Sequence, residues 1–332
     1  MPKLTIKEIL MKIVNYSPTA APYVGNIYAQ FLADAAIDDL KSLLNEIKTI
    51  SKEERQSLNT TNSELIKMQE AVNELIGTKS KKTRMTVLIP AGGEGGSLFP
   101  VTQVMPKCLV TIGNKSMLQH IIDPFYHQQD LFDKTIVMTD KYSDAVNENI
   151  KQGNYGNFVE CAQISGKTLP DALLKLKDSL PEKPFVIHYN DVLIEECDWN
   201  HIYDRYFEYK KRNKHIGMLL CSNYYPSPLG IGVIKEGKPD TLSSFIEKPE
   251  QLSGRDLANL AIAIFEPEIF RYMESGHSGL FENTISNVIQ SKRTLSLYRI
   301  EKWHHVQDLK ALYYLQNNAD LSFLTNRFKR IR

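Results

Sequence analysis

The chain is poor in cysteine and has no excess of charge of either sign. Its 332 residues include 4 cysteines, far apart and without a Cys-x-x-Cys pair, which indicates a reducing compartment and no structural zinc. The 40 Lys and Arg residues balance 39 Asp and Glu residues, giving a net charge of +1. We therefore predict no nucleic-acid partner and no membrane partner.

Long apolar runs are also missing. The longest uncharged stretches, residues 15–33 and 216–234, each contain two prolines and several polar residues, so we expect neither to span a membrane. The N-terminus lacks the apolar core of a signal peptide, and we predict a cytoplasmic protein. The 42% of hydrophobic residues is enough for one large α/β domain plus a smaller unit.

Glycine is concentrated in one place. Gly92, Gly93, Gly95 and Gly96 follow an apolar run, residues 85–89, that predicts a buried strand. Glycines after a strand let the backbone turn sharply and point several N–H groups at a phosphate. Lys107 then supplies a mobile cation for the same charge. The spacing fits neither a P-loop nor the dinucleotide-binding fingerprint.

This segment resembles the signature of the sugar-1-phosphate nucleotidyltransferases, the pyrophosphorylases that make nucleotide sugars. Their pattern is close to Ala-Gly-Gly-x-Gly-Thr-Arg-Leu-x-Pro-x-Thr, followed by Pro-Lys-x-Leu. The matching positions are Ala91, Gly92, Gly93, Gly95, Leu98, Pro100, Thr102, Pro106, Lys107 and Leu109. The resemblance covers about residues 85–310. It implies that Ala91, Gly92, Gly93, Gly95, Gly96 and Ser97 bind a nucleotide and that Lys107 is catalytic.

One departure lies inside the signature. The family's Thr-Arg pair is replaced by Gly96 and Ser97. The family's arginine binds the triphosphate, whereas serine donates one hydrogen bond and carries no charge. We therefore expect weaker stabilisation of the transferring phosphoryl group.

A second candidate site residue ends another apolar run. Residues 185–189 predict a strand, and Asn190 and Asp191 follow it, where parallel sheets place their ligands. The resemblance implies that Asp191 is catalytic and binds Mg²⁺, and a carboxylate suits this cation. The alternative is an aspartate that caps a turn. Near the C-terminus, His305 stands where the family has its second magnesium-binding aspartate, and histidine suits Mn²⁺ or Zn²⁺ better.

Two further sets of residues match the family's substrate contacts. The resemblance implies a sugar-phosphate site that consists of Gly232, Glu247, Lys248 and Asn259. An exposed strand end with an ion pair is the alternative interpretation. Gln163 ends a predicted strand where related enzymes contact the base; an ordinary strand-end glutamine is equally compatible. The pattern leaves uracil, thymine, guanine, adenine and cytosine open.

The chain divides into two parts. Residues 1–83 carry apolar residues at helical spacing and end in a basic linker, which predicts a helical accessory module that forms a homo-oligomer or packs against the rest. Residues 84–332 alternate predicted strands and helices, which favours a three-layer Rossmann-like α/β domain with a mostly parallel sheet. The predicted strands are residues 85–89, 134–139, 158–163, 185–189, 216–221, 231–234 and 261–265; the predicted helices begin at Lys115, Tyr142 and Leu169.

The leading function is transfer of a nucleotidyl group from a nucleoside triphosphate to a sugar 1-phosphate, with release of pyrophosphate. The implied cofactor is Mg²⁺, with Mn²⁺ as the alternative. Two rivals remain open because Ser97 and His305 replace charged residues of the family. One is a nucleotide-binding or nucleotide-sugar-binding regulatory protein that has lost catalysis. The other is a scaffold built on the N-terminal helices, with the nucleotide domain as its regulator.

Overall fold

The computed structural model describes residues 82–318, apart from 94, 196, 213, 224–232, 248–255 and 278, together with positions 45, 48, 49 and 69. Except for positions 45, 48, 49, 69, 82 and 83, the predicted helical module and linker lie outside the described residues. The chain splits into two compact units, one of residues 1–84, 127–130 and 325–332 and the other of residues 85–126 and 131–324. The domain boundary after residue 83 stays a prediction. Every strand among the described residues belongs to the second unit.

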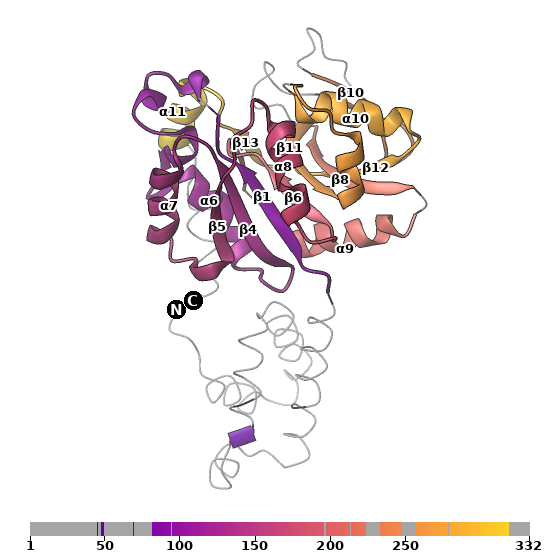
Figure 1. Cartoon of the computed structure of the whole chain (residues 1–332), viewed down its shortest axis with the longest axis horizontal. Helices are drawn as coiled ribbons and strands as arrows, with labels where there is room; N and C mark the ends of the chain where they lie inside the picture. Colours follow the sequence, from indigo (N-terminus) through magenta and orange to yellow (C-terminus); the bar gives the residue numbers. More distant parts are fainter. Residues whose placement is uncertain are drawn as a thin grey trace, which may run out of the picture. The chain divides into compact units, whose positions relative to one another are not determined.

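A nine-stranded mixed sheet forms the centre of this unit (Figure 1). Its parallel half has the order β6-β1-β4-β5, and these strands are Phe185–His188, Met85–Pro90, Phe132–Thr139 and Val159–Gln163. Strand β11, Leu257–Phe265, pairs antiparallel with β6 and joins the second half. That half contains β8 (His215–Ser222), β9 (Val233–Glu236), β10 (Leu242–Ile246) and β12 (Thr294–Arg299).

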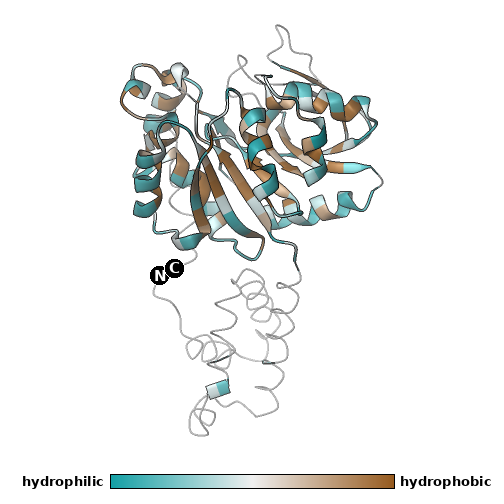
Figure 2. Cartoon of the chain, viewed as in Figure 1, coloured by the Kyte–Doolittle hydropathy of each residue, from teal (hydrophilic) through white to brown (hydrophobic). Residues whose placement is uncertain are grey.

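Helices cover both faces of the sheet. Side chains alternate along a strand, so Val87 and Ile89 of β1 join one apolar core while Leu88 joins the other. The first core includes residues of α6 (Met117–Tyr126), α7 (Ser143–Gln152), α9 (Trp199–Lys210) and α11 (Leu309–Asn318). The second includes residues of α8 (Leu169–Leu176) and α10 (Leu280–Gln290). The three-layer α/β prediction is confirmed, and Figure 2 shows the apolar strands between amphipathic helices.

Shorter elements complete the unit. Two small ribbons are β2 with β3, Thr111–Ile112 and Lys115–Ser116, and β7 with β13, Val192–Ile194 and Trp303–His305. The 3₁₀ turns are η1 (Gly96–Leu98), η2 (Val101–Gln103), η3 (Lys107–Leu109), η4 (Gly156–Phe158), η5 (Lys177–Ser179) and η6 (Pro267–Tyr272).

Some predicted boundaries were wrong, for local reasons. The helix expected from Lys115 begins at Met117, because Lys115 and Ser116 pair with β2 across a turn in which Gly113 has φ 63°. The helix that begins at Leu169 was expected to run to Leu180, but it ends at Leu176 and continues as the η5 turn. Strand β11 starts at Leu257 rather than Ala261, since a bulge interrupts its register near Ala261.

Candidate functional site

The candidate residues gather at one edge of the sheet. Strands β1, β4, β5 and β6 are parallel, so their carboxyl ends lie at the same edge, which is where open α/β sheets bind ligands. The glycine loop follows β1, Gln163 ends β5, and Asp191 lies just beyond β6. The fold therefore brings together the segments that the sequence singled out separately.

The glycine loop is held at its base and open at its tip. The Ala91 N–H donates to the Met138 carbonyl (2.7 Å), which ties the start of the loop to β4. Gly95 has φ 67°, and its carbonyl accepts from the Thr102 hydroxyl (2.8 Å). A Cβ at Gly95 would lie 2.8 Å from the Thr102 methyl, so this position requires glycine.

The tip of the loop is accessible to a ligand. Ideal Cβ positions at Gly93 and Gly96 meet nothing within 4 Å among the described residues, and Gly93, Gly96 and Ser97 are not buried. Gly92 is half-buried and Ala91 is buried. Backbone N–H groups in an open glycine loop are suited to binding phosphate oxygens.

Lys107, Asp191 and His305 form a compact charged cluster beside the loop. The Lys107 Nζ lies 2.8 Å from Asp191 Oδ2, and the His305 Nε2 lies 3.6 Å from the same oxygen. The side chains are only 11%, 21% and 14% exposed, respectively. Although burial raises the pKa of the Asp191 carboxyl, the nearby His305 imidazole and the Lys107 charge outweigh burial and hold this pKa below its usual range.

Each member of the cluster is positioned by a short element. Lys107 opens the η3 turn, and Asp191 precedes strand β7. Strand β13 pairs with β7, which sets His305 opposite Val192. The Val306 N–H donates to the Asp191 carbonyl (2.8 Å) and fixes the end of this ribbon. Residues 84 positions apart, Lys107 and Asp191, thus make a direct ion pair.

In the cluster of Lys107, Asp191 and His305, Asp191 is the side chain that offers the oxygen ligands preferred by a hard cation such as Mg²⁺. Magnesium in phosphate-binding sites usually takes one or two carboxylates together with substrate oxygens and water. Among the described residues, no three His, Cys, Asp or Glu side chains are grouped to hold a metal. His305 Nδ1 is buried and has no hydrogen-bond partner within the described part of the chain. The metal-binding roles of Asp191 and His305 therefore stay predictions.

Two of the predicted sugar-phosphate residues can be placed. Asn259 is 7% exposed, and its Oδ1 has no hydrogen-bond partner among the described residues. Because β11 runs antiparallel to β6 and Ile262 pairs with His188, Asn259 lies beyond the carboxyl end of β6. Burial raises the pKa of the Tyr189 phenol, and the negative charges of Asp191 and, to a smaller extent, Glu247 raise it further. Gly232 and Lys248 lie outside the described residues.

The predicted base contact lies at the far end of this edge. The Gln163 side chain is exposed, and its Nε2 donates to the Asp140 carbonyl (3.3 Å). Downstream, Thr168 forms the N-cap of α8 in a reciprocal capping box with Asp171. Thr168 therefore caps helix α8. The base contact by Gln163 stays a prediction.

The sequence reasoning missed two features of this edge. Asp140 follows β4 directly and lies beside Gly92, where an ideal Cβ would be 3.5 Å from the Asp140 Cβ. Its position after a predicted strand was an available signal. The second is the bulge of β11, where Ala261 has φ 54° and its carbonyl accepts from the Tyr189 N–H (3.2 Å). Nothing about an alanine signals such a conformation.

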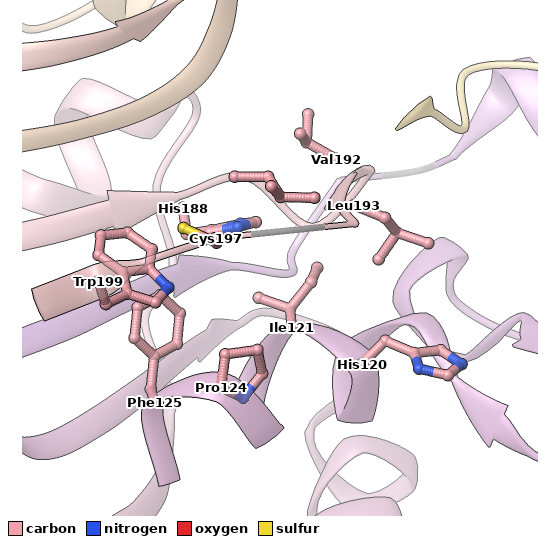
Figure 3. Close-up of a pocket in the computed structure, with 10 residues that line it drawn as sticks. His120, Ile121, Pro124, Phe125, His188, Val192, Leu193, Cys197 and Trp199 are labelled. Atoms are coloured by element: carbon pink, nitrogen blue, oxygen red, sulfur yellow. The ribbon is translucent and has the colours of Figure 1, made fainter. Parts of the chain in front are cut away.

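A small cavity of about 20 Å³ has a different character (Figure 3). It has room for about one water molecule. Apolar side chains of α6, β7 and α9 line it, together with His120, His188 and Cys197. Phe125 and Trp199 pack against each other at a ring-centroid distance of 4.8 Å. None of the cluster residues Lys107, Asp191 and His305 lines this cavity, which belongs to the core.

A glycine loop and a lysine–aspartate pair at the carboxyl edge of such a sheet are typical of α/β proteins that bind phosphorylated ligands. The nucleotidyl transferase family model matches residues 86–320, and the chain belongs to this family. The resemblance drawn from the motifs is thereby confirmed. Within the described residues, no helix combines the length and apolar character needed to cross a membrane.

Similar proteins agree with this family. Mannose-1-phosphate guanyltransferase of Emericella nidulans is 26% identical over 219 residues, which are 62% of this chain and 56% of the relative. The Saccharomyces cerevisiae protein of the same name is also 26% identical, over 64% of this chain and 58% of the relative. The chain therefore spans little more than half the length of these relatives.

Solved structures support the fold. A UDP-glucose pyrophosphorylase complexed with UDP-glucose matches 75% of this chain and all of its own, with a TM-score of 0.59 and 17% identity. A putative glucose-1-phosphate thymidylyltransferase from Bacillus anthracis matches 73% of this chain and 99% of its own, with a TM-score of 0.57 and 18% identity. At these identities the likeness concerns the fold alone.

Proposed function

We propose that the protein transfers a nucleotidyl group from a nucleoside triphosphate to a sugar 1-phosphate and releases pyrophosphate. The observation that carries this proposal is the pairing of Lys107 with Asp191 (2.8 Å) beside an open glycine loop. The cluster combines a cation for phosphate oxygens with a carboxylate for a hard cation. The similarity to mannose-1-phosphate guanyltransferases supports the same chemistry.

The reaction needs positioning and charge neutralisation more than covalent chemistry by the protein. An oxygen of the sugar phosphate attacks the α-phosphorus of the triphosphate, the bond to the β-phosphate oxygen breaks, and pyrophosphate leaves in line. The loop from Ala91 to Ser97 binds the triphosphate through backbone N–H groups. Lys107 exchanges its contact with Asp191 for the phosphoryl oxygens and neutralises the charge that develops on them.

Asp191 is the residue that would hold a divalent cation in this site. When bound, Mg²⁺ or Mn²⁺ neutralises charge on the phosphate oxygens and orients them. His305 lies 3.6 Å from the same carboxylate oxygen, and its imidazole suits Mn²⁺ better than Mg²⁺. Mn²⁺ is therefore the cation that we expect His305 to favour.

The sugar phosphate is proposed to lie on the β11 side of Asp191. The Asn259 amide oxygen has no hydrogen-bond partner among the described residues and offers an acceptor for a sugar hydroxyl. The Glu247 charge contributes to the raised pKa of Tyr189, which lies two residues before Asp191 in the chain. Gly232 and Lys248 complete this proposed set from outside the described residues. A polar atom that is buried without a partner is costly, so a ligand hydroxyl would satisfy Asn259.

A second candidate function has specific observations in its favour. Ser97 carries no charge where the family has arginine, and His305 stands where the family has aspartate. A protein that binds a nucleotide or nucleotide sugar without turning it over would tolerate both changes. The Lys107–Asp191 pair is compatible with such a binding role as well.

Turnover separates the two candidates. Pyrophosphate release is measured with the full chain, five nucleoside triphosphates, and mannose and glucose 1-phosphates, with Mg²⁺ and with Mn²⁺. We expect pyrophosphate release only when both the nucleoside triphosphate and the sugar 1-phosphate are present. We expect the Asp191→Asn variant to release none. Nucleotide binding without release under every combination would favour the regulatory role.

Location and assembly belong to the same proposal. The four cysteines all lie among the described residues and form no disulfide there, which supports a reducing, cytoplasmic setting. Oligomer formation through residues 1–83 stays a prediction. Light scattering tests it by measuring the molar mass of the full chain in solution.

A further inference from the structure

The ribbon of β7 and β13 is short for an element that positions two site residues. Each strand has three residues, and an isolated two-stranded ribbon is marginally stable in water. Asp191 precedes β7 and His305 ends β13, so the approach of their side chains depends on how these strands pair. Side chains on the two faces of the ribbon must therefore select the observed register.

One face of the ribbon carries an apolar selection. Trp303 lies opposite Ile194 and is 2% exposed, and its ring stacks on His305 with a centroid distance of 6.4 Å. A slip by one residue would turn Trp303 and His305 to the other face, so the burial of Trp303 opposes it. A slip by two residues keeps the same faces but moves His305 about 7 Å along the strand, away from Asp191. The alternation of faces alone does not exclude this second slip.

The other face carries a polar pair. The His304 Nε2 lies 2.5 Å from the Glu195 Oε1, and the side chains are only 20% and 22% exposed. His304 lies opposite Leu193, so Glu195 is its diagonal neighbour on the same face. A carboxylate oxygen only accepts, so the His304 Nε2–H donates. The Glu195 N–H also donates to the Lys302 carbonyl (3.1 Å), which joins the same ends of the two strands.

We propose that Glu195 is a positioning residue: its pair with His304 fixes the ribbon register that places His305 in the charged cluster. A slip of one or two residues would shift His304 by about 3 or 7 Å relative to Glu195 and break their hydrogen bond. The pair therefore stabilises the register in which the His305 Nε2 lies 3.6 Å from Asp191 Oδ2. The inference rests on the proposed function in one respect, the divalent cation assigned to Asp191.

The test measures the affinity of the full chain for Mn²⁺ alone, from the electron paramagnetic resonance of the free ion. It counts only the binding that Asp191→Asn removes. We expect Glu195→Ala to lower this affinity at least about tenfold, as is typical when groups that orient metal-binding side chains are removed. His304→Ala removes the same pair from the other strand and should give the same loss. Glu195→Gln keeps an acceptor for His304 and should stay within about twofold of the wild type. Circular dichroism verifies the fold of each variant.

A double-mutant cycle separates positioning from a general structural role. If Glu195 acts through His305, Glu195→Ala should change the Mn²⁺ affinity less than about twofold in a His305→Ala background. A residue that merely supports the fold would lower the affinity equally in both backgrounds. Glu274→Ala is the matched control, because it removes the carboxylate 3.0 Å from another histidine, His277, and it should leave the Mn²⁺ affinity unchanged.

Equal losses from Glu195→Ala with and without His305, or the same loss in Glu195→Gln, would overturn the positioning role. The absence of Mn²⁺ binding that depends on Asp191 would overturn it as well. Pyrophosphate release is assayed separately with the same variants. If the Mn²⁺ affinities follow the expected pattern while the wild type releases no pyrophosphate, the proposed transfer is wrong and the positioning role stands.

Discussion

At the scale of single residues, the site combines one carboxylate with two basic side chains. Asp191 accepts from Lys107 and faces His305, and all three side chains are largely buried. A partly buried carboxylate needs such partners, since an unpaired charge there is costly. The same groups are those that a phosphate or a cation would engage. The resting ion pair therefore keeps the site charged and ordered until a ligand replaces it.

Removing the lysine charge should weaken nucleotide binding. We predict that Lys107→Ala lowers nucleoside triphosphate affinity at least tenfold, because a hydrogen bond to a charged group contributes about 1.5–3 kcal/mol. Calorimetric titration measures this effect, and circular dichroism verifies the fold. Lys134→Ala, at a half-buried lysine of β4 that pairs with Glu160, is the control. Unchanged affinity in Lys107→Ala would remove the lysine from the site.

Restoring the family's charges should raise turnover. Ser97 is exposed, so Ser97→Arg has space for its longer side chain, and His305→Asp supplies a second carboxylate beside Asp191. We predict a higher kcat in the double variant, since electrostatic stabilisation is usually the largest contribution to such transfers. The two changes need not add, because both act on one phosphate chain. If the wild type already turns over rapidly and the double variant has a lower kcat, the prediction is wrong. The pocket would then be adapted to Ser97 and His305.

Motif residues were predictable from the sequence, whereas their spatial partners were not. Ala91 to Ser97, Lys107 and Asp191 each follow or begin a recognisable element. The approach of His305 to Asp191 depends on the pairing of β13 with β7, two short strands far apart in the chain. No local pattern encodes that pairing, and the same holds for Asp140 beside Gly92.

At the scale of elements, buried parallel strands were predictable and irregular strands were not. Strands β1, β4 and β6 contain continuous apolar runs of the kind that parallel sheets bury on both faces. Strand β11 is also apolar, but its bulge places Ala261 at φ 54°. Such a conformation is costly for alanine and depends on the neighbouring strands. The start of β11 was therefore predicted four residues too late.

The N-terminus of α8 should depend on its capping box. We predict that Thr168→Ala lowers the free energy of unfolding by about 1 kcal/mol, because the Asp171 N–H loses its acceptor. Asp171→Ala should cost more, since Asp171 also accepts from the Ser275 hydroxyl and the Gly276 N–H. Urea denaturation measures both. Equal stability of Thr168→Ala and the wild type would mean that the cap contributes nothing.

At the scale of the whole molecule, the packed interior around the sheet holds histidines away from water. Burial lowers the pKa of His188 to about 4, and burial together with the Arg212 charge lowers the pKa of His215 to about 4. Both histidines are therefore neutral in the fold at pH 7. The interior stabilises the neutral form of each ring, which links stability to pH.

We predict that stability falls as the pH drops from about 6.5 to 4. Above pH 6.5 the histidines are neutral in both states. Below it the unfolded chain binds protons that the fold excludes, at a cost of up to about 3 kcal/mol for each histidine. His215→Gln should reduce the dependence of the unfolding free energy on pH in this window, whereas the exposed His277→Gln should not. An unchanged dependence in His215→Gln would contradict the burial account.

The most direct test of the proposed nucleotidyl transfer traces isotope-labelled phosphate oxygens from the sugar 1-phosphate into the products. The full chain is incubated with a nucleoside triphosphate, a divalent cation and a sugar 1-phosphate whose non-bridging phosphate oxygens carry ¹⁸O, and the products are analysed by mass spectrometry. The account predicts a nucleotide sugar that retains the label, including the oxygen between its two phosphorus atoms, and unlabelled pyrophosphate. Bound triphosphate with no nucleotide sugar, or label in the pyrophosphate, would contradict it.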